Sequence, residues 1–198
     1  MFIGIIALYG ILMRMIIGIT GTDGAGKGTV VAYLVQKRGF THYSARALII
    51  EEIQKRNVAD NRENMRLVAN DLRRAHGNDF VVAFSLQKAR EEGKNDIVIE
   101  SIRTVGEATT LKENGGILLC VDADRRIRYE RIAQRGSSSD HVTFEEFVLL
   151  EEKEMSDADP DGPQKAAVMR MADHTIRNDV SETDLFARIE EFLHQFAV

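Results

Sequence analysis

The apolar positions of the chain alternate between two kinds of run. Short, almost continuous runs of β-branched and other apolar residues are typical of strands buried on both faces of a parallel sheet. Longer segments, in which apolar residues recur every three or four positions, indicate amphipathic helices. This alternation predicts an α/β fold with right-handed crossovers and five parallel strands. The predicted strands are 15–20, 39–44, 96–100, 117–121 and 174–178.

The predicted helices fill the intervals between these strands. Glycines end several of them, at Gly77, Gly93 and Gly115. A segment at 156–163 contains both prolines of the chain and is expected to be a connector. The predicted helices are the segment after 27, then 45–56, 62–76, 79–92, 105–114, 125–135, 143–155, 164–171 and a last helix that begins at 179–183.

A glycine-rich loop separates the first strand from the first helix. Glycines allow backbone conformations that a side chain would hinder, so that successive N–H groups can point at an anion beside the helix N-terminus. Gly21, Gly26 and Lys27 have the spacing of a phosphate-binding loop, in which the lysine reaches the β- and γ-phosphates. The residues predicted to bind nucleotide phosphates are Gly21, Asp23, Gly24, Ala25, Gly26, Lys27, Gly28 and Thr29.

The end of this loop departs from the general pattern. Gly28 stands where Ser or Thr is expected, and Thr29 supplies a hydroxyl one position later. The Gly-Lys-Gly-Thr form resembles adenylate kinase and other nucleoside monophosphate kinases, while 22–24 looks more like thymidylate kinases. The resemblance covers 15–198 and implies a three-layer P-loop NTPase fold with a short lid, and ATP and Mg²⁺ as cofactors. A glycine-rich turn without a ligand is the alternative.

Two charged residues follow the third predicted strand at its carboxyl end, Glu100 and Arg103. Ligands collect beyond the carboxyl ends of strands in open parallel sheets, so we expect both near the loop. The stretch resembles an adenylate kinase element and, more closely, one of dephospho-coenzyme A kinase-like proteins and archaeal kinase relatives. Glu100 and Arg103 are predicted to bind substrate, Arg103 also to act catalytically, and Glu100 with Thr29 to place Mg²⁺, partly through water. A helix N-cap region with incidental charges is the alternative.

The resemblance implies that 44–92 holds the phosphate acceptor. Ser44 is expected to cap the helix that follows it and to contact the ligand, and Arg46 to clamp the acceptor phosphate, because arginine offers a planar fork of donors. In the helix 62–76 we select Arg73 over Arg66 as a further substrate-binding residue. Surface arginines without a ligand are the alternative for each position.

The helix 125–135 contains five arginines. Arg131 and Arg135 resemble the Arg-x-x-x-Arg element that leads into the lid of these kinases, and they are predicted to act catalytically on the β- and γ-phosphates. The resemblance places the lid and its connector at about 136–163, and Asn178 under the adenine ring. The other arginines are expected to be solvated or salt-bridged, and they are Arg125, Arg126 and Arg128.

Composition narrows the class of protein. The chain has 198 residues, is 44% hydrophobic and 29% charged, and carries a net charge of −5, which is ordinary for a soluble single domain. This charge argues against nucleic acid as the main partner, whereas a small anion needs only a local pocket. One cysteine, Cys120, excludes an intramolecular disulfide. We expect a cytoplasmic monomer or homodimer that does not bind a membrane.

The first fourteen residues are apolar, but no basic residue precedes the apolar stretch and no small-residue cleavage site follows it. We therefore expect 1–14 to be an extension from start-site choice or a poorly ordered arm that precedes the kinase domain at 15–198. A peripheral membrane anchor is the alternative.

The predicted function is transfer of the ATP γ-phosphate to a nucleoside or deoxynucleoside monophosphate. The alternative acceptor is the ribose hydroxyl of dephospho-coenzyme A, for which Asp23 is the candidate general base. A regulatory P-loop switch is the alternative that is not an enzyme. The sequence contains neither an Asn-Lys-x-Asp guanine motif nor an ATP-transporter signature, which argues against the switch.

Overall fold

The protein was analysed as a computed structural model that describes residues 15–135, 143–155 and 164–196, without the side chains of 62, 63, 66, 153 and 154. The predicted extension 1–14 lies outside the described residues, as do the parts 136–142 and 156–163 of the predicted lid and connector. In the described ranges, every helix is too short or too polar to cross a membrane.

One five-stranded parallel sheet forms the middle layer, with β1 at its centre and the strand order β2-β3-β1-β4-β5. This confirms the predicted sheet. The apolar run of β1 is almost wholly buried because helices cover both faces of the sheet, as parallel strands require. The strands are β1 (Met15–Gly21), β2 (Thr41–Ser44), β3 (Asp96–Glu100), β4 (Ile117–Asp122) and β5 (His174–Arg177).

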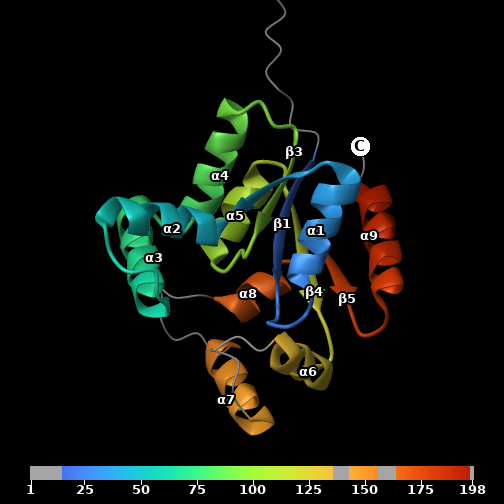
Figure 1. The fold of residues 1–198 in the computed structure, drawn as a ribbon. Coiled ribbons are helices and arrows are strands. Elements are labelled where there is room, and N and C mark those ends of the chain that lie inside the picture. Colours follow the sequence, from blue (N-terminus) through green and yellow to red (C-terminus); the bar gives the residue numbers. More distant parts are fainter. Residues whose placement is uncertain (1–14, 136–142, 156–163, 197–198) are drawn as a thin grey trace, which may run out of the picture.

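Helices cover the two faces of the sheet, each over its own apolar core (Figure 1). On one face lie α1 (Lys27–Arg38) and α9 (Glu182–Phe196), which bury Leu34 and Phe192. On the other face lie α4 (Phe80–Glu91), α5 (Val105–Glu113) and the short α8 (Lys165–Arg170). The result is the predicted three-layer arrangement.

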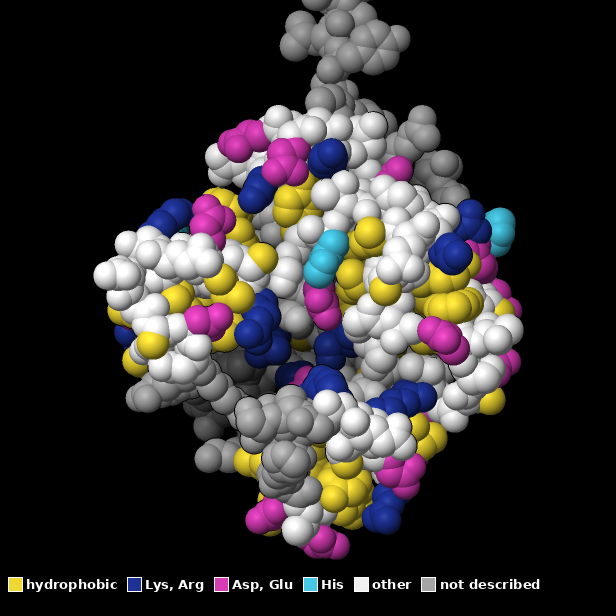
Figure 2. Space-filling model, in the orientation of Figure 1, with side chains coloured by type: hydrophobic (Ala, Val, Ile, Leu, Met, Phe, Trp, Pro, Cys, Tyr) yellow, Lys and Arg dark blue, Asp and Glu magenta, His cyan; other side chains and the backbone are white. Residues whose placement is uncertain are grey.

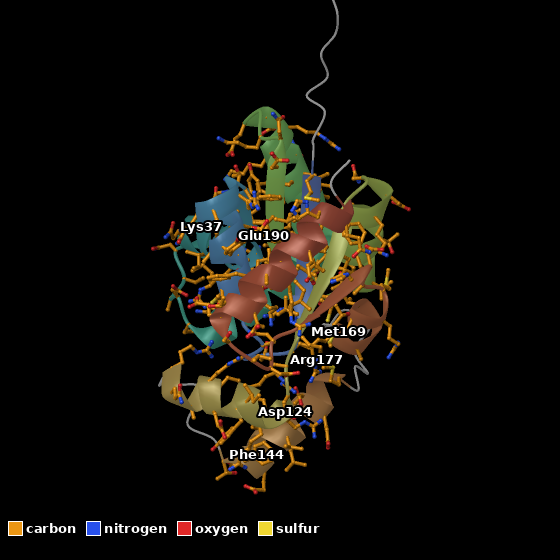
Figure 3. All side chains as sticks on the ribbon, turned by 90° about the vertical axis from the view of Figure 1, so that its right-hand side faces the viewer. Lys37, Asp124, Phe144, Met169, Arg177 and Glu190 are labelled. Carbon is orange, nitrogen blue, oxygen red and sulfur yellow. The ribbon has the colours of Figure 1, made fainter. Side chains whose placement is uncertain are left out.

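Two helix pairs extend the domain beyond these layers. The pair α2 (Ala45–Arg56) and α3 (Arg62–His76) has its own small core, built on Ile53 and Val68. The pair α6 (Arg125–Arg135) and α7 (Phe144–Met155) follows β4 at the carboxyl end of the sheet. Figure 3 shows this end from the side, with Arg177 of β5 above Asp124 and Phe144, which lie at the starts of α6 and α7. Because α2 follows β2 and α6 follows β4, both pairs begin at the carboxyl end of the parallel sheet, where β1 leads into the glycine loop.

Candidate phosphate-binding site

The glycine loop joins β1 to α1 in a conformation that depends on glycine. Gly24 has φ +78°, and a Cβ there would lie 2.6 Å from the carbonyl oxygen of Arg128. Gly26 has φ +96° and is the N-cap of α1. No side chain caps this helix, so its first N–H groups remain available to a ligand anion. The positive φ angles occur at glycines of the predicted phosphate-binding loop, and phosphate binding there stays a prediction.

Lys27 is the first residue of α1, and its side chain folds back over the loop. Its Nζ donates to the carbonyl oxygen of Thr22 at 2.7 Å and to that of Gly21 at 3.1 Å. Burial, helped by the charges of Lys165 and Arg103, lowers the pKa of Lys27, although the carboxylate of Asp23 opposes this. Lys27 is thus a partly buried cation whose ammonium group donates to carbonyl oxygens of the loop itself.

Side chains from the carboxyl ends of β4 and β5 support the loop. The hydroxyl of Thr22 donates to Asp122 of β4 at 2.6 Å, and Arg177 of β5 pairs with the other oxygen of that carboxylate at 2.8 Å. Asn178, which is 7% exposed, donates from its side-chain amide to the carbonyl oxygen of Ala25 at 2.8 Å. Asn178 was predicted to contact the base; its side chain here supports the loop.

Asp23 is the half-exposed acid of the loop, and it lies between two lysines. Its Oδ2 is 3.1 Å from Nζ of Lys165, and its Oδ1 is 3.5 Å from Nζ of Lys27. Burial would raise the pKa of Asp23, but the charges of Lys165, Lys27 and Arg103 outweigh burial and lower it to about 2. Asp23 is therefore an ionised carboxylate with low proton affinity.

A small cavity, here called the loop cavity, opens between this loop and the chain that follows β3. Within the described residues, its lining carries three cationic side chains and one carboxylate. Figure 2 shows a hollow on this face in which Lys and Arg side chains gather. The lining residues are Thr20, Gly21, Asp23, Lys27, Ser101, Ile102, Arg103 and Lys165.

The end of β3 brings Glu100 beside β2. Nε2 of His42 lies 3.3 Å from Oε2 of Glu100, and this hydrogen bond lowers the pKa of Glu100. Arg103 follows in the loop, where its side chain is exposed and its N–H donates to Glu107 at 2.7 Å. Glu107 also completes a capping box with Thr104, which fixes the start of α5. Of the two predicted residues, Arg103 lines the loop cavity, whereas Glu100, at the end of β3, is not among its described lining residues.

The predicted acceptor residues differ in their surroundings. Arg73 of α3 is partly buried; its Nη1 donates to Asn70 at 3.1 Å, and its buried Nε has no hydrogen-bond partner. Burial lowers the pKa of Arg73. The charge of Glu107 opposes this shift, and the charge of Arg103 adds to it. Arg46 is exposed in the first turn of α2. Ser44 occupies the predicted N-cap position of α2, although its side chain makes no capping hydrogen bond among the described residues.

Among the arginines of α6, the buried one is Arg128, which is 4% exposed. Its Nη1 donates to the carbonyl oxygen of Asp23 at 3.3 Å, and its guanidinium pairs with Glu151 of α7. Arg131 has a buried Nη1 that finds no hydrogen-bond partner within the described ranges, and Arg135 is exposed at the end of α6. Arg128, which was expected to be solvated or salt-bridged, is salt-bridged and connects α6 to the loop.

The loop cavity brings together the predicted residues Asp23, Lys27 and Arg103. Gly28 and Thr29 lie in the first turn of α1 next to it. Sequence reasoning missed Lys165 and Asp122. Asp122 carried a usable signal, because it ends a buried strand in the same way as Glu100, whereas Lys165 lies in a short segment without a motif.

The donor set also bears on Mg²⁺. No cluster of three or more His, Cys, Asp or Glu side chains that could hold a metal ion occurs in the part of the chain that the structure describes. Thr29 and Glu100, the predicted Mg²⁺ ligands, offer a hydroxyl and a carboxylate oxygen, which are donor types that suit Mg²⁺. Mg²⁺ is commonly bound through one or two protein ligands together with phosphate oxygens and water.

Comparisons with known proteins agree with this geometry. A family model described as an AAA domain, AAA_18, matches residues 17–159. A UPF0200 protein of Pyrococcus horikoshii is 30% identical over 183 residues, which cover 89% of this chain and 95% of that protein. A UPF0200 protein of Thermococcus kodakarensis is 29% identical over 187 residues, or 91% of this chain and 97% of that protein.

Solved structures show the same fold. Shikimate kinase from Bacteroides thetaiotaomicron superposes with a TM-score of 0.62 at 13% identity, covering 91% of this chain and 98% of that one. A gluconokinase from Sinorhizobium meliloti gives a TM-score of 0.52 at 14% identity, covering 94% and 95%. The fold is therefore that of P-loop kinases.

Proposed function

The chain belongs to the AAA domain family AAA_18 and is related to the UPF0200 proteins, and on this premise we propose that it transfers the γ-phosphoryl group of ATP to a nucleoside or deoxynucleoside monophosphate. One observation carries the proposal. Lys27, Lys165 and Arg103 line a single cavity beside a glycine loop with the backbone of a phosphate cradle. Phosphoryl transfer needs little from a protein except positioning and positive charge, which this cavity supplies.

The protonation of the acids favours an acceptor that is already an anion. A hydroxyl acceptor benefits from a general base whose pKa is near neutrality. The pKa of Asp23 is about 2, and that of Glu100 is lowered by its hydrogen bond with His42. A phosphate acceptor needs no base, so these lowered pKa values support a nucleotide over dephospho-coenzyme A.

In the proposed reaction, each residue of the site binds a particular part of the substrates. The loop amides and Lys27 bind the nucleotide phosphates, and Arg103 stabilises the charge that develops on the transferred group. Arg73, whose Nε has no hydrogen-bond partner among the described residues, is assigned to the acceptor phosphate. When Mg²⁺ is bound through Thr29 and Glu100, it supplies further positive charge to the phosphates. Arg46, Arg131 and Arg135 remain predicted contacts to acceptor and ATP.

The test is a coupled assay of ADP release with nucleoside monophosphates, deoxynucleotides and dephospho-coenzyme A as separate acceptors. We expect at least one monophosphate to stimulate turnover. Lys27→Ala should abolish it, while Lys37→Ala, at the exposed far end of the same helix, should retain it. If dephospho-coenzyme A were the one acceptor to stimulate turnover, it would take the place of the nucleoside monophosphate in the proposal. ATP turnover that ignores every acceptor would favour a regulatory switch.

A further inference from the structure

Lys165 has a position that the sequence motifs do not explain. It is the first residue of α8, is 7% exposed and contacts the glycine loop, from which it is separated by more than 130 residues of chain. Lysine is almost never fully buried unless its charge is compensated. Its ammonium nitrogen lies 3.1 Å from Oδ2 of Asp23. Lys165 therefore places a buried cation beside the glycine loop.

The structure fixes Lys165 in place through its neighbour Gln164. The N–H of Gln164 donates to the carbonyl oxygen of Arg103 at 2.6 Å, and its side-chain oxygen accepts from the N–H of Val105 at 3.1 Å. Val168, one turn further along α8, is fully buried against the sheet. The start of α8 is thus held against the same segment that supplies Arg103 to the loop cavity.

The carboxylate of Asp23 bridges the two lysines with its two oxygens. Oδ1 faces Lys27 and Oδ2 faces Lys165, at 3.5 Å and 3.1 Å. Two oxygens of a phosphoryl group are spaced much like those of a carboxylate, so a phosphoryl group in contact with Lys27 can also reach Lys165. Lys27 is the residue that approaches the β- and γ-phosphates in this motif.

The charges in the cavity are unbalanced in favour of an anion. Among the described lining residues, Lys27, Lys165 and Arg103 outnumber Asp23 by three charges to one. Lys165 and Arg103 each lower the pKa of Lys27, as like charges at close range do. A terminal phosphoryl group that enters the cavity would meet three cationic side chains.

We propose that Lys165 is a second phosphate-binding lysine, which contacts the terminal phosphoryl group of ATP, and that Asp23 occupies this anion site as an internal substitute until the nucleotide displaces it. This inference rests on the proposed function for the identity of the nucleotide. It assigns Lys165 a direct contact with the substrate and gives Asp23 a role other than that of a general base.

The test measures binding without turnover, by calorimetric titration of the full chain with Mg²⁺ and either ADP or the non-hydrolysable analogue adenosine 5′-(β,γ-imido)triphosphate. Lys165→Met should weaken binding of the triphosphate analogue about 10- to 100-fold, the range for a hydrogen bond between charged groups, and binding of ADP much less. Lys165→Arg, which keeps the charge, should recover most of the affinity. Arg170→Met is the matched control. It removes a charge at the other end of α8, where Arg170 lines a different cavity.

A double variant separates direct contact from an effect through Asp23. Asp23→Asn removes the internal competitor, so we expect it to bind the analogue more tightly than the unchanged protein. If Lys165 contacts the phosphate, Lys165→Met should still weaken binding at least about tenfold in the Asp23→Asn background. If Lys165 only restrains Asp23, its replacement should have no effect in that background, and the proposal would be wrong.

Two further results would overturn the proposal: equal losses for ADP and the analogue, or the same loss in Lys165→Met and Arg170→Met. Urea midpoints of each variant show whether it is folded. These outcomes are independent of the acceptor assay. Triphosphate binding that depends on Lys165 without stimulation by any acceptor would refute the proposed function alone. Acceptor turnover with Lys165-independent binding would refute this inference alone.

Discussion

Replacing Arg128 by methionine tests how α6 is fixed to the glycine loop. The guanidinium donates to the carbonyl oxygens of Ala123 at 2.9 Å and Asp23 at 3.3 Å, and it pairs with Glu151. Both members of the ion pair are buried, with Arg128 4% and Glu151 8% exposed. Arg128→Met keeps much of the side-chain volume but leaves the acid without this partner.

The expected loss follows from the burial of Glu151. Removing one member of a buried ion pair costs about 3–5 kcal/mol, because a charge remains in a poorly solvated place. Arg125 keeps its Nε at 2.8 Å from the second oxygen of Glu151, so we expect the lower end, about 3 kcal/mol. In the double variant Arg128→Met/Glu151→Met both charges are gone, and we expect a total loss of about 1 kcal/mol or less.

Urea unfolding followed by far-ultraviolet circular dichroism measures these losses, since the chain has no tryptophan. Arg126→Met is the matched control on the same helix. Its side chain is 63% exposed and lies 3.5 Å from Glu130, so its loss should stay below about 0.5 kcal/mol. Equal stability losses in Arg128→Met and Arg126→Met would refute the reasoning. So would a loss in Arg128→Met/Glu151→Met that equals the sum of the losses in Arg128→Met and Glu151→Met measured separately.

Three further predictions concern the loop and the core. Gly24→Ala should cost about 1–3 kcal/mol of stability and weaken phosphate binding, because it strains a positive φ and places Cβ against the carbonyl of Arg128. Gly28→Ala has no heavy atom near its Cβ, so it should be neutral or slightly stabilising. The midpoints of urea unfolding compare the two variants. The pKa of Asp23 is lowered from 3.8 to about 2, so its contribution to stability is present above pH 4 and lost as the pH falls towards 2. The stability difference from Asp23→Asn should shrink over that window, and a difference that grows there would contradict the pairing. Burial raises the pKa of Cys120 to about 11, so alkylation by iodoacetamide at pH 8 should be at least about 100-fold slower in the folded chain than in urea, and equal rates would contradict its burial.

Much of the fold follows from periodicity alone. The helices 45–56 and 62–76 have the predicted bounds, because their apolar spacing and flanking polar residues agree. The strand β3 also has the predicted bounds, whereas the other strands differ by one or two residues at one end; β2, for example, begins at Thr41 rather than 39. Such ends depend on pairing with neighbours, which the local sequence does not contain.

The site was harder to predict, because its members lie far apart along the chain. Lys27 was found through its motif, and Arg103 through its place after a buried strand. Lys165 has neither signal, and its burial depends on how α8 packs against β1 and α5. The arginines of α6 look alike in composition, and only the packing of α7 over Arg128 distinguishes it from Arg126. The catalytic and acceptor roles assigned to individual arginines stay predictions.

The supports of the glycine loop have a consequence for synthesis of the chain. The loop is made within the first thirty residues, but its contacts come from Asp122, Arg128, Lys165 and Asn178, all in the last eighty. A nascent chain that has exposed the whole glycine motif therefore still lacks every one of these side chains. Nucleotide capture should begin late in translation, after β5 has left the ribosome, and fragments that stop before Asn178 should carry the motif without the affinity.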